Sequence, residues 1–128
     1  MVQEASTDYL STEVAEVDRV VVVRLTGELD MCSEPAPEDV LRARIAARPD
    51  AVVLDLREVT FFGSNGISLL LSAVEEARSH GVGFAVVADS RPVLRPLEVT
   101  DMLGVVTVFG AVDDAVAFVR DVECAVHQ

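Results

Sequence analysis

The chain has no lysine and no tryptophan, and only two of its 128 residues are cysteines. Without lysine, the phosphate-binding motif G-x-x-x-x-G-K-[ST] cannot form. Cys32 and Cys124 lie far apart and make no C-x-x-C pair, so we interpret them as free thiols in a reducing compartment. The two histidines, His80 and His127, stand at no metal-ligand spacing from a cysteine. From these absences we expect the chain to have no metal site and no bound cofactor.

Positive charge is also scarce. All ten basic residues are arginines, spread along the chain against 22 acidic residues, and the formal net charge is −12. Such a surface repels nucleic acids and anionic membranes. No apolar run approaches the roughly 20 residues that a membrane span needs, and the N-terminus lacks the basic start and apolar core of a signal peptide. We therefore expect a cytoplasmic protein with no direct contact to nucleic acid or membrane.

Aromatic residues make up only 5% of the chain, whereas hydrophobic residues make up 51% and are mainly valine, leucine and alanine. This profile is typical of helices packed on a largely buried sheet. The length suits one domain over residues 1–128, in which we expect residues 1–7 to form a flexible terminus.

Apolar and β-branched runs predict the strands, and periodic apolar positions between them predict the helices. The order β-β-α-β-α-β-α-β-α indicates an α/β fold with about four helices. Its sheet is mostly parallel, with about five strands and an antiparallel N-terminal edge strand. A turn is expected at Asp18-Arg19 and a loop at residues 27–30. The strands are expected at residues 9–17, 20–26, 51–56, 84–88 and 105–109, and the helices from near residues 37, 65, 91 and 113.

The segment after residue 65 has the clearest helical pattern. Its apolar residues follow the offsets 0, 3, 4, 7 and 10, which places them on one predicted inner face: Ile67, Leu70, Leu71, Val74 and Ala77. Gly81 suits the left-handed position that ends many helices. The last helix is expected to be capped by Asp113 or Asp114.

The segment V-T-F-F-G-S-N-G-I, residues 59–67, leads from a central strand into this helix. Ser64 stands at the helix start, where several backbone N–H groups lack intrahelical partners and negative charge is favoured. Either Ser64 or Asn65 could cap the helix. A serine hydrolase would need G-x-S-x-G, but Phe62 stands two residues before Ser64, and neither histidine is suitably placed as a base. These residues therefore argue against a hydrolytic enzyme.

The neighbours of Ser64 are not explained by capping alone. Phe61 and Phe62 are adjacent on an extended segment, so we expect one ring in the core and the other near the surface. Gly63 and Gly66 leave the backbone around Ser64 open. We therefore predict a docking site for another protein as well as a helix start.

Two segments resemble the sulphate-transporter and anti-sigma-factor-antagonist (STAS) family, and within it the stand-alone anti-sigma factor antagonists. V-R-L-T-G-E-L-D at residues 23–30 resembles the family's second strand and the loop after it. D-L-R-E-V-T-F-F-G-S-N-G-I at residues 55–67 is similar to the family pattern D-L-x-x-[LV]-x-[FY]-x-[DG]-S-[ST]-G-[LI]. The resemblance spans roughly residues 9–122 and implies a single STAS-type domain.

The resemblance implies a bacterial stress-response switch that is not an enzyme. In this family the unphosphorylated antagonist binds an anti-sigma factor with serine kinase activity, which frees a sigma factor. The kinase then phosphorylates the antagonist, which dissociates, and a phosphoserine phosphatase resets it. Carried onto this chain, the resemblance makes Ser64 the phosphoacceptor. The implied partner-binding residues are Asp30, Phe62, Gly63, Ser64, Asn65 and Gly66.

Two positions depart from the family pattern. Gly63 stands where many relatives have Asp, which predicts slower phosphorylation or a different kinase. Asn65 replaces the usual Ser or Thr and leaves Ser64 as the single candidate acceptor. An alternative hypothesis is a STAS scaffold or ATPase-associated subunit that is never phosphorylated. The sequence leaves open whether the chain forms a weak homodimer and whether Cys32 has a redox role.

Overall fold

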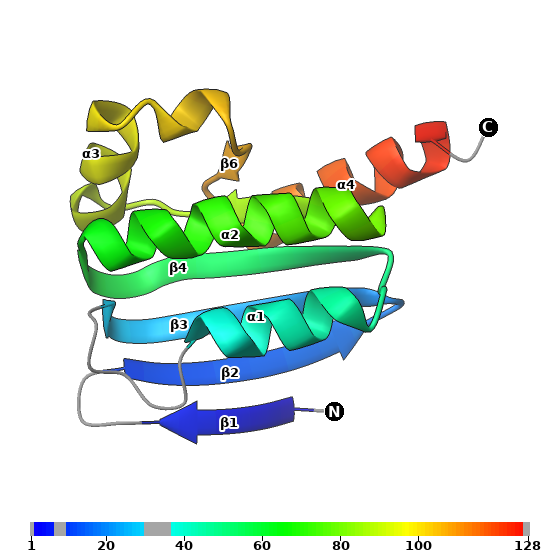
Figure 1. Cartoon of the computed structure of the whole chain (residues 1–128), viewed down its shortest axis with the longest axis horizontal. Coiled ribbons are helices and arrows are strands. Elements are labelled where there is room, and N and C mark those ends of the chain that lie inside the picture. The colour runs from blue at the N-terminus through cyan, green and yellow to red at the C-terminus, as the bar shows by residue number, and fades with distance from the viewer. Residues whose placement is uncertain (1, 7–9, 30–36, 127–128) are drawn as a thin grey trace.

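The computed structural model describes residues 2–6, 10–29 and 37–126, with side chains described at 11–29 and 37–120. One sheet of six strands runs through this part of the chain, in the spatial order β1-β2-β3-β4-β5-β6 (Figure 1). The elements are β1 (Val2–Ser6), β2 (Leu10–Val17), β3 (Val20–Leu29), α1 (Pro37–Ala46), β4 (Ala51–Phe62), α2 (Ser64–His80), β5 (Gly83–Val87), α3 (Arg91–Val99), the 3₁₀ turn η1 (Met102–Gly104), β6 (Val108–Phe109) and α4 (Val112–Val126).

The N-terminal side of the sheet is antiparallel and the rest is parallel. β1 pairs with β2 and β2 with β3 in antiparallel register, whereas the pairs β3–β4, β4–β5 and β5–β6 are parallel. The turn at Asp18 and Arg19 joins β2 to β3 with positive φ values of 51° and 67°, as a two-residue turn of the I′ kind requires. The α/β class, the predicted turn and the mostly parallel sheet are confirmed.

The N-terminus corrects one expectation. Within residues 1–7, which were expected to be flexible, Val2–Ser6 forms β1 and pairs with β2 from Ala15 to Ser11. The sheet therefore has six strands rather than five. The physical reason is that β2 without β1 would present a row of unpaired backbone N–H and C=O groups at the sheet edge.

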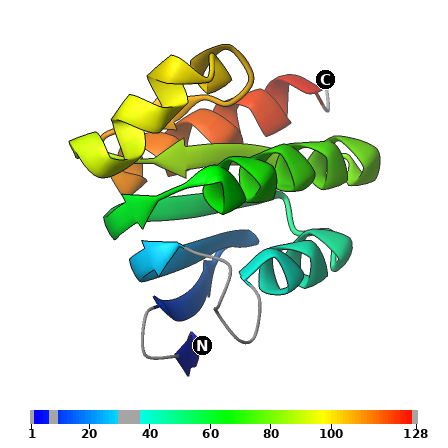
Figure 2. The same ribbon diagram turned by 60° about the vertical axis from the view of Figure 1, so that its left-hand side comes forward.

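Helices cover both faces of the sheet. α1, α2 and α3 contribute to the core on one face, and α4 covers the other (Figures 1 and 2). The first core joins sheet and helix residues that include Leu25, Leu54, Leu41, Leu70 and Leu97. The second core is smaller and consists of Val20, Ala51, Val53, Ala85, Val87, Ala115 and Val119. Because the central strands are buried on both sides, their sequences show no clean alternation.

Two strands are longer than their sequences predict. β3 continues to Leu29 and β4 to Phe62, where the sequence indicated strand ends at residues 26 and 56 and a loop at 27–30. The additional residues of β3 and β4 pair with each other. The β3–β4 ladder contains two register shifts and ends with Leu29 opposite Phe62. Gly27 has a φ of 113°, which a side chain would disfavour. Polar and apolar residues are mixed in these extensions, so only pairing between the two strands identifies them as sheet.

The buried face of α2 also differs from the prediction. Leu70 and Ala77 point into the core as expected, but Leu71 is 46% exposed, and Ile67 and Val74 are only partly buried. The residues that face the sheet are Gly66, Leu69, Leu70, Ala73 and Ala77. Small residues dominate this face, so the helix can lie close to the sheet. Gly81 ends the helix in the left-handed conformation, as predicted, with φ 69° and ψ 31°.

The C-terminal elements are shorter or shifted relative to the sequence prediction. The strand expected at residues 105–109 is only Val108–Phe109. α4 begins at Val112, so Asp113 and Asp114 lie inside its first turn instead of capping it. There they still favour the helix, because negative charge near an N-terminus interacts well with the helix dipole. None of the helices in the described ranges combines the length and apolar character that crossing a membrane requires.

Candidate functional site

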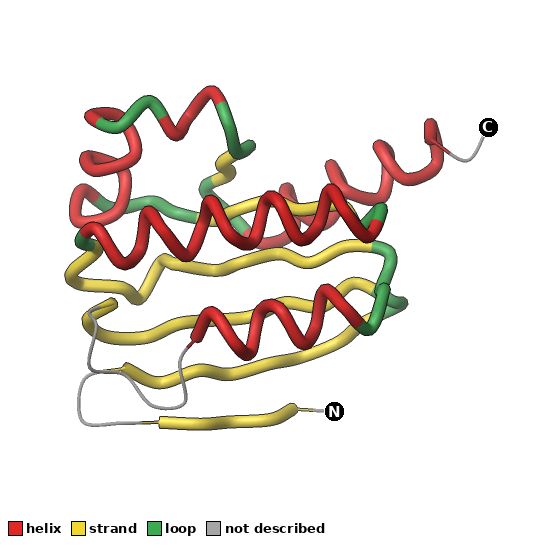
Figure 3. The backbone as a smooth tube through the Cα atoms, in the orientation of Figure 1, coloured by secondary structure: helices red, strands yellow, loops and turns green. Residues whose placement is uncertain are grey.

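The connection between β4 and α2 consists of one residue. β4 ends at Phe62, Gly63 is the N-cap, and α2 begins at Ser64 (Figure 3). The Gly63 carbonyl accepts hydrogen bonds from the backbone N–H groups of Gly66 at 2.9 Å and Ile67 at 3.3 Å. The prediction that Ser64 or Asn65 caps the helix is therefore wrong. Gly63 holds that position and has no side chain with which to cap.

Ser64 is exposed in the first turn of α2, and so is Asn65. The first turn contains no acidic residue. The leading N–H groups of a helix have no intrahelical carbonyl partners and carry a partial positive charge. An anion attached to the Ser64 hydroxyl would therefore be placed in a favourable local field.

The two phenylalanines before the loop point in opposite directions, as the sequence predicts. Phe62 is 3% exposed and belongs to the main core, whereas Phe61 is 50% exposed. This corrects the assignment of Phe62 to the partner-binding surface, because a buried ring offers a partner almost no area. Phe61 is the aromatic residue of this surface that sequence reasoning left out. Its exposure depends on which face of β4 packs on α2, and that is a tertiary property.

Gly66 is buried against Phe62 and is not part of the accessible surface either. A Cβ added at Gly66 would lie 2.6 to 2.8 Å from three ring carbons of Phe62, which is too close for any side chain. The missing side chain allows the first turn of α2 to rest directly on the Phe62 ring. Gly66 therefore positions the first turn of α2, which contains Ser64, by packing against Phe62 in the core.

Gly63 is under no such constraint. Its φ of −93° is ordinary for residues with a side chain, and a Cβ there would lie 3.0 Å from the nearest ring carbon of Phe61. Because Phe61 is half exposed, its ring can move aside. The backbone therefore does not require glycine at position 63.

The remaining predicted site residue, Asp30, lies outside the described residues, as does Cys32. Leu29, the last described residue before them, pairs with Phe62 at the end of the β3–β4 ladder. The end of β3 and the start of α2 are thus brought to the same edge of the sheet by strand pairing. The side chain of Cys124 is also outside the described part.

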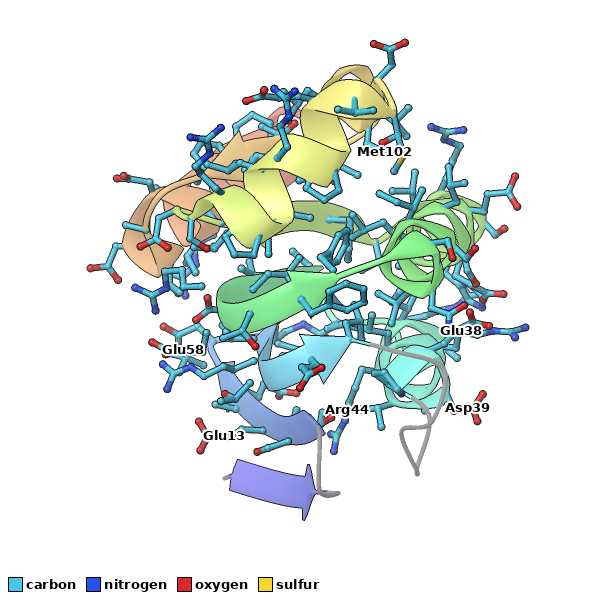
Figure 4. The ribbon with its side chains drawn as sticks, turned by 90° about the vertical axis from the view of Figure 1, so that its left-hand side faces the viewer. Glu13, Glu38, Asp39, Arg44, Glu58 and Met102 are labelled. Atoms are coloured by element: carbon cyan, nitrogen blue, oxygen red, sulfur yellow. The ribbon has the colours of Figure 1, made fainter. Side chains whose placement is uncertain are left out.

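An ion cluster in the middle of the β3–β4 ladder was not anticipated from the sequence. The Asp55 side chain is 1% exposed and accepts hydrogen bonds from Arg57 Nε at 3.0 Å, from Arg57 Nη2 at 2.9 Å and from the Arg57 backbone N–H at 3.1 Å. Arg24 Nε on β3 adds a contact of 3.4 Å, and Arg24 also lies 3.8 Å from Glu13. Figure 4 shows Glu13 and Glu58 on the side of the sheet away from α1 and α2.

This cluster lies at the first register shift of the β3–β4 ladder, between Arg24 and Thr26. Burial of the Asp55 carboxylate by itself raises its pKa. The hydrogen bonds from the Arg57 side chain and backbone and the charges of Arg57 and Arg24 more than compensate, so the pKa of Asp55 is lowered below its ordinary value. The ionised Asp55 therefore ties the irregular part of β4 to its own backbone and to β3.

The described residues offer no catalytic machinery around Ser64. His80 is at the opposite end of α2, about 24 Å away at 1.5 Å per residue, and its Nδ1 lies 2.8 Å from the Glu76 carbonyl oxygen. No group of three or more His, Cys, Asp or Glu side chains within the described ranges is arranged to hold a metal ion. Ser64 is thus accessible to another protein but has no base of its own among these residues.

Known proteins are similar to this chain in both fold and sequence. The STAS domain family model matches residues 11–115. The anti-sigma-F factor antagonist RsfB of Mycobacterium tuberculosis is 31% identical over 116 residues, which cover 91% of this chain and 94% of that protein. A crystal structure of an anti-sigma factor antagonist from Mycobacterium paratuberculosis is 35% identical, with a TM-score of 0.82 and coverage of 91% of this chain and 98% of that one.

The fold is also found at lower identity. The anti-sigma factor antagonist SpoIIAA in its unphosphorylated form is 20% identical, with a TM-score of 0.73 over 86% of this chain and 96% of that one. These similarities agree with the two sequence segments that frame the site. The chain belongs to the STAS domain family.

Proposed function

We propose that this protein is an anti-sigma factor antagonist controlled by phosphorylation of Ser64. Its unphosphorylated form binds an anti-sigma factor that is also a serine kinase, and this binding releases a sigma factor. Phosphorylation of Ser64 by that kinase ends the complex, and a phosphoserine phosphatase restores it. The protein is a substrate and binding partner and not itself an enzyme.

The observation that carries the proposal is the position of Ser64. It is the exposed first residue of α2, follows a one-residue connection, and has the half-exposed Phe61 three residues before it. A kinase needs an accessible hydroxyl, and a partner needs apolar area beside it. Of the described residues, Phe61, Gly63, Ser64 and Asn65 form this proposed partner surface, with Gly66 and Phe62 supporting it from the core.

The switching mechanism follows from charge. A phosphoserine adds about −1.5 to −2 charges at neutral pH. The helix N-terminus tolerates this charge within the protein. At a protein interface the same charge must be desolvated or repelled, and the chain already has a net charge of −12. Binding can therefore be switched off at the surface without refolding of the domain.

The similarity to RsfB supports the partner class, because that relative is named for its antagonism of an anti-sigma factor. The competing hypothesis of a STAS scaffold that is never phosphorylated uses the same surface constitutively. It predicts that Ser64→Ala and Ser64→Asp bind the partner equally well.

Incubation with the purified cognate anti-sigma factor and ATP tests the proposal. Mass spectrometry should find one phosphate, located on Ser64, and none on Ser64→Ala. Ser64→Asp should bind the anti-sigma factor at least tenfold more weakly than the wild type, whereas Ser64→Ala should retain binding.

Ser79 provides the matched control, because it is also exposed and lies near the opposite end of α2, about 22 Å from Ser64 at 1.5 Å per residue. Ser79→Asp carries the same charge change and should bind as the wild type does. Phosphate on another residue, or unchanged binding by Ser64→Asp, would contradict the proposal.

A further inference from the structure

A shallow groove lies beside Ser64, between the end of β4 and α3. Its volume is about 450 Å³. Figure 2 shows α3 next to the end of β4, at the same end of the molecule as the start of α2. The residues that line the groove are Thr60, Phe61, Phe62, Arg91, Pro92, Arg95 and Pro96.

The surface of the groove is mainly apolar. Phe61 is half exposed, Pro92 is exposed and Pro96 is partly buried. Exposed aromatic and proline side chains with rigid geometry lose little conformational entropy when a partner covers them. The groove therefore has the character of a pocket for one apolar side chain.

The charged residues that line the groove are both basic. Arg91 and Arg95 are exposed, and their spacing of four residues places them on the same side of α3. Neither forms an ion pair with a described carboxylate, and no carboxylate lines the groove. In a chain with ten arginines against 22 acidic residues, a patch with two unpaired arginines and no acid is a local reversal of the surface charge.

We propose that this groove is the second half of the docking surface and receives an acidic segment of the anti-sigma factor. An apolar side chain of that segment enters between Phe61 and the prolines, and carboxylates beside it pair with Arg91 and Arg95. This inference rests on the proposed function and adds the chemistry of the partner segment. Charge complementarity selects such a segment, since a basic one would be repelled by both arginines.

Phosphorylation of Ser64 would also affect binding in the groove. Ser64 is three residues beyond Phe61, a backbone span of at most about 11 Å. This is close to the screening length of roughly 8 to 10 Å at physiological ionic strength. A phosphate on Ser64 would therefore repel the carboxylates of a segment that sits beside Phe61. This repulsion weakens the contact.

The test measures binding of the purified anti-sigma factor to unphosphorylated full-length variants by calorimetry at low salt. Arg91→Glu combined with Arg95→Glu should weaken binding at least tenfold, and the loss should shrink at high salt. The pair Arg91→Lys and Arg95→Lys keeps the charge and should bind within threefold of the wild type. Phe61→Ala should weaken binding at both salt concentrations, because it removes apolar contact area.

The matched control combines Arg48→Glu with Arg78→Glu. Both residues are exposed and unpaired with described carboxylates; Arg48 lies two residues beyond the end of α1, and Arg78 lies in the last turn of α2. This control has the same net charge as the groove variant and should bind as the wild type does. Circular dichroism checks that every variant is folded.

Two results would overturn the inference. Binding by the groove variant within twofold of the wild type would show that the arginines are not part of the contact. An equal loss in the control would show that only net charge matters. In either case wild-type binding and phosphate on Ser64 would leave the proposed function intact. If the wild type neither bound the anti-sigma factor nor accepted phosphate at Ser64, the proposed function would fail and the groove proposal with it.

Discussion

The ring of Phe62 occupies the space that a side chain at position 66 would need, with its nearest carbon 2.6 Å from an added Cβ. Strand β4 and helix α2 are therefore in contact at the residue pair that brackets Ser64. The domain core and the proposed phosphorylation site meet at this contact.

Gly66→Ala should destabilise the protein even though alanine is the better helix former. Alanine gains up to about 1 kcal/mol of helix propensity, whereas overpacking in a filled core costs about 1 to 3 kcal/mol. We expect a net loss of about 1 kcal/mol or more in the free energy of unfolding, measured by urea denaturation. Gly110→Ala is the control, since no atom lies within 4 Å of its added Cβ. A Gly66→Ala protein as stable as the wild type would show that the Phe62 ring can move away.

Gly63→Asp should be tolerated. The φ of Gly63 is −93°, and the only close neighbour of an added Cβ is the movable ring of Phe61. An aspartate at the N-cap also accepts hydrogen bonds from the helix N–H groups and interacts favourably with the helix dipole. We expect the free energy of unfolding to rise by about 0.5 kcal/mol, as measured by urea denaturation.

Gly63→Ala separates the effect of the added Cβ from the effect of the carboxylate. It introduces the same Cβ without the carboxylate and should be less stable than Gly63→Asp, because alanine is a poor N-cap. The phosphorylation rate of both variants by the cognate kinase then reports whether a carboxylate before Ser64 assists phosphate transfer. A strongly destabilised Gly63→Asp would mean that the Phe61 ring is held in place.

Asp55→Asn should lower the free energy of unfolding by about 3 kcal/mol at neutral pH. It removes the buried carboxylate that Arg57 and Arg24 contact, so Arg57 loses its carboxylate partner while Arg24 keeps Glu13 at 3.8 Å. Asp50→Asn is the matched control, because the Arg19–Asp50 pair is exposed and should contribute less than 1 kcal/mol. The free energy of unfolding of both variants is measured by thermal or urea denaturation. Similar losses for Asp55→Asn and Asp50→Asn would contradict the claim that burial makes the Asp55 ion pairs more important.

The same cluster predicts a dependence on pH. The pKa of Asp55 is lower in the folded state than its ordinary value of 3.8, so the folded state binds fewer protons than the unfolded chain. The contribution of Asp55 is therefore fully present above about pH 4 and is lost as the pH falls through the lowered folded pKa. The stability difference between wild type and Asp55→Asn should shrink over that acidic range. A difference that stayed constant below pH 4 would argue against an ionised Asp55 in the folded protein.

Leu70→Ala and Leu71→Ala test the orientation of α2. Leu70 is fully buried, and its truncation should cost about 2 to 5 kcal/mol. Leu71 is 46% exposed, so its truncation should change the free energy of unfolding by less than about 1 kcal/mol. Urea denaturation distinguishes the two, and equal losses would support the helix face predicted from the sequence.

The α2 helix illustrates why a periodic pattern is an incomplete guide. Its apolar residues outnumber the positions that the core can hold, so the sequence allows more than one inner face. Ile67, Leu71 and Val74 fit a helical stripe as well as Leu69 and Ala73 do. The contact between Gly66 of α2 and Phe62 of β4 selects the rotation of the helix about its axis. This contact joins a helix to a strand, so the pattern within the helix alone does not reveal it.

The sequence by itself determined the α/β class, the order of the strands and α-helices from β2 onward and the segment that contains Ser64. These properties follow from local propensities, from the period of apolar residues and from a motif that is contiguous in the chain. They do not depend on which segments meet in space.

Only the tertiary structure decided how the surface around Ser64 is composed. It made Gly63 the helix N-cap, turned Phe61 outward and Phe62 inward, and placed Arg91 and Arg95 of α3 beside them. It also paired Arg24 with Asp55 across the β3–β4 ladder. Each of these results depends on strand register or helix rotation, which are set by contacts between segments that are distant in sequence.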